Sequence, residues 1–257
     1  MASAPLKVFI TGASSGLGAA LAAHYASRGA VLGLAARRAD KLAEVAAALA
    51  TPASVYGLDV ADRNALVAAA EDFCSRHGTP DIVIANAGIS AGTWCSNPED
   101  LAVLERVLRT NVMGLAATLA PFVEPMRKRR SGALVGIASV AGLRGLPGNG
   151  AYSASKAAAI NWLEALRVEL HGSGVRVVTV CPGYIETPMT AVNRFPMPFL
   201  ISAEDAARRT ARAIERGSAL VIFPWQMRLV FAFLRRAPAW MFDRIFARTP
   251  RKLRSGG

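Results

Sequence analysis

The sequence predicts an α/β domain in which a doubly wound parallel sheet of about seven strands is covered by helices on both faces. Short apolar runs, several of them rich in β-branched residues, alternate with longer segments of helix-forming residues, and this is the order of a βαβ protein. Of the 257 residues, 53% are hydrophobic but only 7% are aromatic, which suits helices packed closely on a sheet and argues against disorder. No repeat or interdomain linker interrupts the pattern. We therefore expect residues 1–218 to form one domain with its active site, and residues 219–257 to add a last strand and a basic amphipathic extension.

The expected strands are short and apolar along most of their length. They lie at residues 6–10, 31–35, 55–58, 82–85, 133–138, 175–180 and 219–223. Runs of this length are too short for stable helices, and strands buried on both faces read as continuous apolar runs. Helical patterns separate them, the first ending near residue 27 and the second covering about residues 40–49.

A glycine-rich turn follows the first strand and opens a helix. It reads Thr11-Gly12-Ala13-Ser14-Ser15-Gly16-Leu17-Gly18. Glycine lets the backbone approach a phosphate closely, and the unpaired N–H groups at a helix start attract its charge. We therefore predict that Gly12, Ser14, Ser15, Gly16, Leu17 and Gly18 bind a dinucleotide. The alternative is a glycine-rich turn with no ligand, which the flanking strand and helix disfavour.

The end of the second strand predicts which dinucleotide is bound. An NAD site usually carries Asp or Glu about 20 residues beyond the glycines, whereas here Arg37 and Arg38 occupy that place and the next carboxylate is Asp40. Arginine offers charge and a planar set of donors to a 2′-phosphate, and Ser14 can add a hydroxyl. We predict NADP(H) rather than NAD(H). The alternative is a pair of solvated arginines at a helix start.

Three further residues predict acid–base chemistry. Tyr152 and Lys156 are four residues apart at the start of a predicted helix and so share one face. A nearby ammonium favours the phenolate, so we expect Lys156 to lower the pKa of Tyr152 toward neutral pH. Ser139 ends the fifth strand, where a side chain faces the ligand crevice of a parallel sheet and can donate to a developing oxyanion.

These motifs resemble, in order and spacing, the short-chain dehydrogenase/reductase family, of the short single-domain type with a Rossmann-type fold. The resemblance covers about residues 6–190 and includes the glycine spacing Gly-x-x-x-Gly-x-Gly. It implies that Asp59 and Val60 read the adenine, that Asn86, Ala87 and Gly88 stabilise the sheet and pack along the cofactor, and that Pro182, Gly183, Ile185 and Thr187 contact the nicotinamide. It also implies that Asn111 is catalytic and helps hold a water-linked proton relay through Lys156.

The reaction that this resemblance implies is hydride transfer between NADPH and a carbonyl group, or its reverse. Ser139 would orient the carbonyl oxygen, Tyr152 would act as general acid or base, and Lys156 would also hold the nicotinamide ribose. Nothing in the sequence requires a metal. Residues 140–147, 91–95 and an apolar lid at 189–201 are expected to line the substrate pocket, which favours a hydrophobic or lipid-like ketone or alcohol. Two alternatives stay open: a 3-oxoacyl thioester reductase, and a non-catalytic NADP-binding sensor or scaffold.

The positive charge is concentrated at one end of the chain. The formal net charge is +12, and residues 219–257 hold eight Lys or Arg against one Asp. Two amphipathic helices are expected there, at residues 225–236 and 240–248, with the large apolar residues and arginines of an interfacial helix. Packing on the active-site lid or on a neighbouring subunit stays open as the alternative. A basic end at 251–257 would add attraction to anionic lipid. Nucleic-acid binding is disfavoured, because aromatics interleaved with a basic patch are missing outside this tail.

Cellular location and assembly are predicted from weaker signals. Cys74, Cys95 and Cys181 lie far apart without metal-ligand spacing and are expected to be reduced and buried. We see no signal peptide and no apolar stretch of about 18 residues, so we expect a cytoplasmic protein that is either free or peripheral at the inner face of a membrane. The family resemblance implies a homodimer or homotetramer.

Overall fold

The computed structural model describes residues 4–247, 249, 252 and 254 and confirms the predicted fold class. Seven parallel strands form one sheet in the order β3-β2-β1-β4-β5-β6-β7. The strands are β1 (Lys7–Thr11), β2 (Val31–Ala36), β3 (Ala53–Gly57), β4 (Ile82–Ala85), β5 (Gly132–Ile137), β6 (Val175–Pro182) and β7 (Leu220–Phe223). Each differs from its predicted range by at most two residues at either end.

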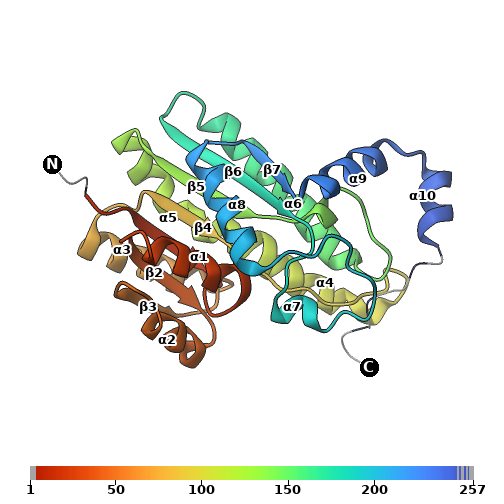
Figure 1. The fold of residues 1–257 in the computed structure, drawn as a ribbon, viewed down its shortest axis with the longest axis horizontal. Helices are drawn as coiled ribbons and strands as arrows, with labels where there is room; N and C mark the ends of the chain where they lie inside the picture. The colour runs from red at the N-terminus through yellow and green to blue at the C-terminus, as the bar shows by residue number, and fades with distance from the viewer. Residues whose placement is uncertain (1–3, 248, 250–251, 253, 255–257) are drawn as a thin grey trace.

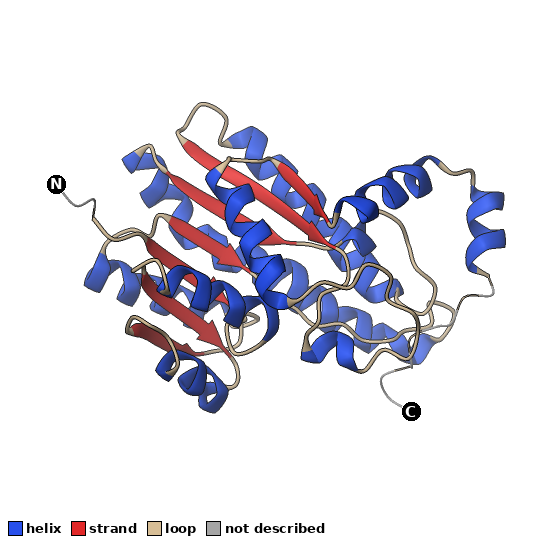
Figure 2. Ribbon diagram, viewed as in Figure 1, coloured by secondary structure: helices blue, strands red, loops and turns tan. Residues whose placement is uncertain are grey.

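Helices cover both faces of the sheet (Figures 1 and 2). They are α1 (Gly16–Ala26), α2 (Ala39–Ala47), α3 (Arg63–His77), α4 (Leu101–Leu108), α5 (Gly114–Arg129), α6 (Gly150–Glu169), α7 (Pro188–Ala191), α8 (Ala203–Glu215), α9 (Trp225–Arg236) and α10 (Ala239–Phe246). The alternation of side chains along a strand explains the two layers. In β1, Val8 and Ile10 pack with α1, α2 and α8, whereas Phe9 packs with α3, α5 and α6.

The strand order reverses next to β1, and this reversal locates the crevice. The chain runs outward from β1 through β2 to β3 and then returns to β4 on the other side of β1. Ligands of such sheets bind where the carboxyl ends of strands diverge in this way. The turn after β1 and the loop after β4 are therefore neighbours, although about 75 residues separate them.

The last strand belongs to the main sheet. Leu220 pairs with Thr179 and Phe223 pairs with Pro182 in a parallel register with β6. After β7 the chain forms α9 and α10, which project at one end of the molecule (Figure 1). Helix α9 has its predicted bounds, and α10 starts one residue before the expected range and ends at Phe246. Arg248, Pro250 and most of the predicted basic end, namely residues 251, 253 and 255–257, lie outside the described residues.

Candidate active site

The glycine-rich turn lies tightly against its own helix. Gly12 and Gly16 have φ angles of 70° and 55°, in the left-handed region that glycine tolerates best. A Cβ on Gly18 would lie 2.3 Å from the carbonyl oxygen of Gly12, so a larger residue cannot occupy that position without displacing the turn. The Ser15 side chain does not cap α1, which leaves the first N–H groups of this helix available to an anion.

Asn86 fastens the turn to the loop after β4. Its Nδ2 donates to the carbonyl oxygens of Thr11 and Gly12, at 3.0 and 3.2 Å, and its backbone N–H donates to Thr11 Oγ1 at 3.3 Å. A Cβ on Gly12 would lie 2.7 Å from the Cα of Ala87. The two loops therefore form one continuous wall, as the predicted sheet-stabilising role of this segment requires.

The two arginines after β2 have different partners. Arg38 Nη2 donates to Ser14 Oγ at 3.0 Å and to Ser15 Oγ at 2.7 Å. Arg37 instead pairs with Asp59, with 3.7 Å between Nη1 and Oδ2. Within the described chain Arg38 has no carboxylate partner. Its charge and the hydroxyl groups of Ser14 and Ser15 lie together at one edge of the crevice. Such a cluster of donors suits a phosphate group.

Ser139, Tyr152 and Lys156 meet at the carboxyl end of β5. Ser139 begins a short 3-10 turn (Val140–Gly142), where its Oγ accepts from Ala141 N at 3.2 Å, and its side chain lines the same cleft as Tyr152. Lys156 Nζ lies 5.8 Å from the centroid of the Tyr152 ring. The spacing of four residues on α6 thus places phenol and ammonium on the same face, as predicted.

The pKa of Tyr152 shifts in the direction opposite to our expectation. Burial raises the pKa of this phenol above its usual value, and the hydrogen bond from Ser139 offsets part of that rise. Lys156 does not reverse the shift, because its Nζ donates to the carbonyl oxygen of Ile137 at 2.7 Å and burial lowers its own pKa to about 8. The sequence spacing predicted that Lys156 is near Tyr152 but not how deeply the phenol is buried, and desolvation has the larger effect on its pKa.

Asn111 lies behind the wall of the crevice rather than in it. It belongs to a π-helical segment (Arg109–Met113) between α4 and α5 and is fully buried. Its Oδ1 accepts from Ile89 N at 2.8 Å, and its Nδ2 donates to Ile89 O at 2.9 Å and to Ser155 Oγ at 3.0 Å. Ser155 Oγ in turn donates to the carbonyl oxygen of Tyr152 at 2.7 Å. The side chain of Asn111 therefore positions the catalytic helix, and its part in a proton relay stays a prediction.

The segment after β6 closes the crevice from the other side. Thr187 starts α7 in a reciprocal capping pair with Thr190, and Thr190 Oγ1 donates to the carbonyl oxygen of Ile185 at 2.6 Å. A Cβ on Gly16 would lie 3.0 Å from Thr187 Cγ2, so this threonine touches the glycine turn. Ile185 also forms a β-bridge with Ile201, which joins the last residue of the predicted lid to the segment that precedes the lid.

Together these elements enclose a cleft of about 590 Å³. Its walls contain every predicted site residue except Gly18 and Asn111, which lie behind the walls. The predicted residues in its lining are Gly12, Ser14, Ser15, Gly16, Leu17, Arg37, Arg38, Asp59, Val60, Asn86, Ala87, Gly88, Ser139, Tyr152, Lys156, Pro182, Gly183, Ile185 and Thr187. A close glycine cradle, an uncapped helix start and a cation at one end fit an elongated ligand that carries phosphates.

The stretches expected to line a substrate pocket have the following neighbours, and their role in binding a substrate stays a prediction. From the lid, Met189 and Thr190 reach the cleft wall. Leu143 and Leu146, in the predicted stretch 140–147, instead pack against Phe231 of α9 and its apolar neighbours on α9 and α10. The C-terminal helices therefore support the loop that follows Ser139. Their packing could not be inferred from the local sequence of either segment.

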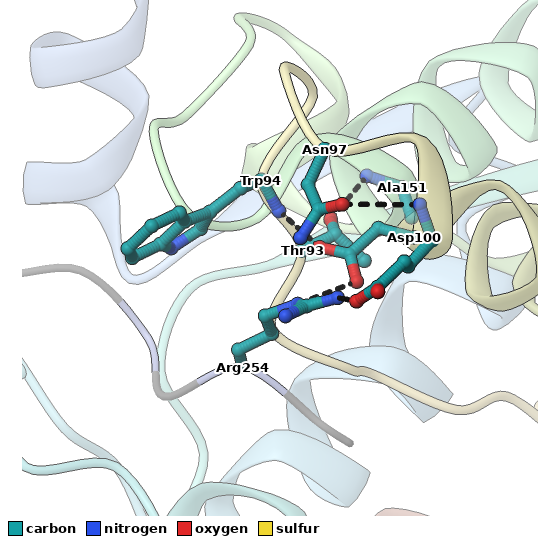
Figure 3. Close-up of polar contacts among 7 residues, drawn as sticks. Thr93, Trp94, Asn97, Asp100, Ala151 and Arg254 are labelled. Carbon is teal, nitrogen blue, oxygen red and sulfur yellow. Dashed lines mark hydrogen bonds and ion pairs between the residues drawn. The ribbon is translucent and has the colours of Figure 1, made fainter. Parts of the chain in front are cut away.

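Thr93 is a supporting residue that sequence reasoning missed. Its Oγ1 accepts from the backbone N–H of Ala151 at 3.1 Å (Figure 3), at the start of α6, one residue before Tyr152. A buried threonine at that distance along the chain has no sequence signal. The expectation that all cysteines are buried was also wrong, because Cys95 is exposed and Cys74 is half-buried, whereas Cys181 is buried.

The same segment is tied to the end of the chain. Asp100 Oδ2 accepts from Trp94 N at 2.7 Å, and its Oδ1 accepts from Arg254 Nε at 2.8 Å (Figure 3). Arg254 also pairs with Glu99. The hydrogen bond from Trp94 and the pairing with Arg254 hold the pKa of the Asp100 carboxyl below its usual value.

Comparison with known proteins places this geometry in context. Residues 7–196 match the family model described as short chain dehydrogenase. An uncharacterized oxidoreductase of Myxococcus xanthus is 40% identical over 237 residues, which are 91% of this chain and 93% of that protein. A ketoacyl reductase of a Nostoc species is 34% identical, over 84% of this chain and 77% of its own length. The crystal structure of a short-chain dehydrogenase from Streptomyces avermitilis superposes with a TM-score of 0.82 at 24% identity, over 95% of this chain and 98% of that chain.

Proposed function

We propose that this chain, which belongs to the short-chain dehydrogenase family, is an NADP(H)-dependent oxidoreductase that interconverts a hydrophobic ketone and its secondary alcohol. The observation that carries the proposal is the meeting of Ser139, Tyr152 and Lys156 in the wall of the cleft that also holds the glycine turn. The oxidoreductase class follows from the family. The cofactor preference and the substrate are our inferences.

Arg38 supports the choice of NADP(H). Its guanidinium carries a charge that no carboxylate in the described chain neutralises, and it donates hydrogen bonds to the hydroxyls of Ser14 and Ser15. These three side chains would hold a 2′-phosphate, while the glycine turn would hold the pyrophosphate. When bound, the cofactor supplies the hydride, which no side chain can supply.

The protein's own residues handle the proton. Because burial raises the pKa of Tyr152, the phenol stays protonated at neutral pH, which is the form that donates to a carbonyl oxygen during reduction. Ser139 lines the same cleft, and its hydroxyl would donate to the same oxygen and stabilise its developing charge. Burial lowers the pKa of Lys156 to about 8, so the ammonium still carries most of its positive charge at neutral pH. It therefore favours the tyrosinate once the proton has left.

The substrate proposal rests on the apolar character of the lid. Met189 is 40% exposed beside the cleft, and Val192, Phe199 and Leu200 are 43 to 65% exposed along the same segment. Exposed apolar side chains of this number in one lid favour an apolar substrate that they can cover. A 3-oxoacyl thioester is the second candidate, because the Nostoc relative is named a ketoacyl reductase.

Turnover should be tested with NADPH and with NADH against aliphatic, aromatic, steroidal and 3-oxoacyl ketones. We expect NADPH-dependent reduction of apolar ketones that falls at least about a hundredfold in Tyr152→Phe, with NADPH binding retained. Tyr56→Phe is the matched control, because it removes a phenol hydroxyl that bonds Asp72 away from the cleft. NADPH binding without turnover of any ketone would favour the sensor alternative instead.

Cofactor choice has its own variant. Arg38→Ala should weaken NADPH binding by roughly tenfold or more and leave NADH binding unchanged, because only the 2′-phosphate loses a charge-assisted partner. Arg212→Ala, which removes an exposed arginine from α8, is the control for a general loss of charge. Equal losses for the two nucleotides would contradict the assignment of Arg38.

A further inference from the structure

Helix α9 is apolar on two opposite sides. Met227, Phe231 and Leu234 are buried, with 3 to 7% of their surface exposed, and they pack toward the loop that follows Ser139. Trp225, Leu229 and Phe233 follow one another at intervals of four residues and are 63, 61 and 59% exposed. An interval of four keeps them on one stripe of the helix. The fold therefore buries the first apolar side of α9 and leaves the second exposed.

Helix α10 also exposes large apolar side chains. Trp240 is 70% exposed and Ile245 is 46% exposed, whereas Phe242 of the same helix is buried against the inner cluster. Both helices project at one end of the molecule, away from the sheet (Figure 1). We call the exposed side chains of Trp225, Leu229, Phe233 and Trp240 the outer face. Soluble proteins seldom expose so many large apolar side chains together unless they bind something.

The charge around the outer face is almost entirely positive. Arg228, Arg235, Arg236 and Arg244 are exposed on the two helices, and none of them forms an ion pair with a carboxylate within the described chain. The only acidic residue of α9 and α10 is Asp243. Tryptophan and phenylalanine beside unpaired arginines are the composition of a helix that lies in the headgroup region of a bilayer.

Length and charge together select the occupant of this face. Helices of 12 and 8 residues are far shorter than the roughly 20 residues that cross a hydrocarbon core, and none of the helices in the described chain is long and apolar enough to span a membrane. If two copies paired through this face about a two-fold axis, they would bring the same arginines together, and like charges repel. Docking on a negatively charged lipid surface needs no spanning helix, and the lipid charge attracts the arginines.

We propose that the outer face of α9 and α10 docks on the surface of an anionic lipid bilayer. The tryptophan rings and Phe233 would enter the headgroup boundary, and the arginines would meet lipid phosphates. This docking does not depend on the proposed activity. If that activity is correct, the loop after Ser139, which packs on the inner side of the same helices, would face the lipid from which an apolar substrate comes.

Vesicle co-sedimentation with the full-length protein tests the docking directly. Binding to phosphatidylcholine vesicles that contain phosphatidylglycerol should exceed binding to pure phosphatidylcholine, and salt should weaken it. The combined variant Trp225→Ser, Phe233→Ser and Trp240→Ser should reduce binding about tenfold or more. No binding by the wild-type protein, or undiminished binding by this variant, would overturn the proposal.

A control variant replaces three apolar residues with similar exposed fractions elsewhere on the protein. Leu101, Met113 and Val168 are 64, 65 and 62% exposed on α4, on the π-helical segment and on α6. Replacing all three by serine should leave vesicle binding unchanged. Binding that falls equally in both combined variants would refute a specific role for the outer face.

Tryptophan fluorescence gives a second readout. Lipids with brominated acyl chains quench tryptophans that enter the bilayer, so we expect quenching that is lost in Trp225→Phe with Trp240→Phe while vesicle binding persists. Quenching that survives in this pair would place Trp94 or Trp162 at the membrane and overturn the proposal. Sedimentation velocity without lipid tests whether a second copy of this chain, rather than a membrane, covers the outer face. A wild-type oligomer that the serine variant dissociates, without any vesicle binding, would mean that a second copy covers the face.

Discussion

Replacement of Lys156 by methionine should make the protein more stable at neutral pH and far less active. The lysine is 4% exposed, and burial lowers its pKa to about 8 from its usual value of 10.5. A cation whose pKa is lower in the folded than in the unfolded chain destabilises the fold. The cost is fully present below pH 8 and is relieved as the pH rises from about 8 to 10.5.

The size of the effect follows from this shift. A difference of about 2.5 pH units corresponds to about 3 kcal/mol of destabilisation at pH 7. Methionine removes this cost but leaves the carbonyl oxygen of Ile137 without the ammonium that donates to it at 2.7 Å, which costs about 1 kcal/mol. Lys156→Met should therefore be about 2 kcal/mol more stable than the wild type at pH 7 and about equal to it by pH 9.5.

Urea unfolding of the nucleotide-free proteins at pH 7, 8.5 and 9.5 measures this difference. Lys128→Met, at an exposed position of α5, should show no pH-dependent difference from the wild type. NADPH-dependent turnover of Lys156→Met should fall at least about a hundredfold. A variant that is less stable than the wild type at pH 7, or whose stability difference is the same at all three pH values, would show that Lys156 is not strained by its burial.

Three further predictions concern the support of the site. Thr93→Val should lower the free energy of unfolding by about 1 to 2 kcal/mol in urea denaturation, because the start of α6 loses its buried acceptor; Thr118→Val, whose hydroxyl bonds a carbonyl of its own helix, should cost less. Gly18→Ala should lower the melting temperature severely and abolish NADPH binding, because its Cβ would lie 2.3 Å from a carbonyl oxygen, whereas Gly145→Ala meets no atom within 4 Å and should be neutral. Thiol titration with a disulfide reagent should show one fast thiol that Cys95→Ser removes, since Cys95 is the exposed cysteine; two fast thiols in the wild type would contradict this exposure.

The sheet and the arrangement of its site could be predicted because both depend on short stretches of sequence. Each buried strand carries its own apolar run, and the turn after β1 carries the glycines that its positive φ angles demand. Parallel strands present their carboxyl ends at one edge of the sheet. Residues that follow different strands, such as Ser139 and Asn86, could therefore be assigned to one crevice without knowledge of any contact.

Contacts between distant segments were not predictable in the same way. Asn111, in a π-helical segment, has no local signal for its hydrogen bonds to Ile89, which lies 22 residues earlier in the sequence. The sign of the pKa shift of Tyr152 depends on how deeply the phenol lies, and the spacing to Lys156 carries no information about depth. For α9, periodicity predicted an amphipathic helix but not that two opposite sides are apolar and only one is covered.

The packing of the C-terminal helices ties them physically to the catalytic loop. Arg144, in the loop that begins after Ser139, donates to the carbonyl oxygens of Leu234 and Arg235 at the end of α9. Its guanidinium also lies 4.4 Å from the ring centroid of Phe242 in α10, within the range of a cation–π contact. A displacement of α9 and α10 must therefore either break these contacts or carry the loop with it. Because this loop begins at Ser139, whose Oγ accepts from the backbone of Ala141, forces on the outer face act on a segment that starts at a predicted catalytic residue.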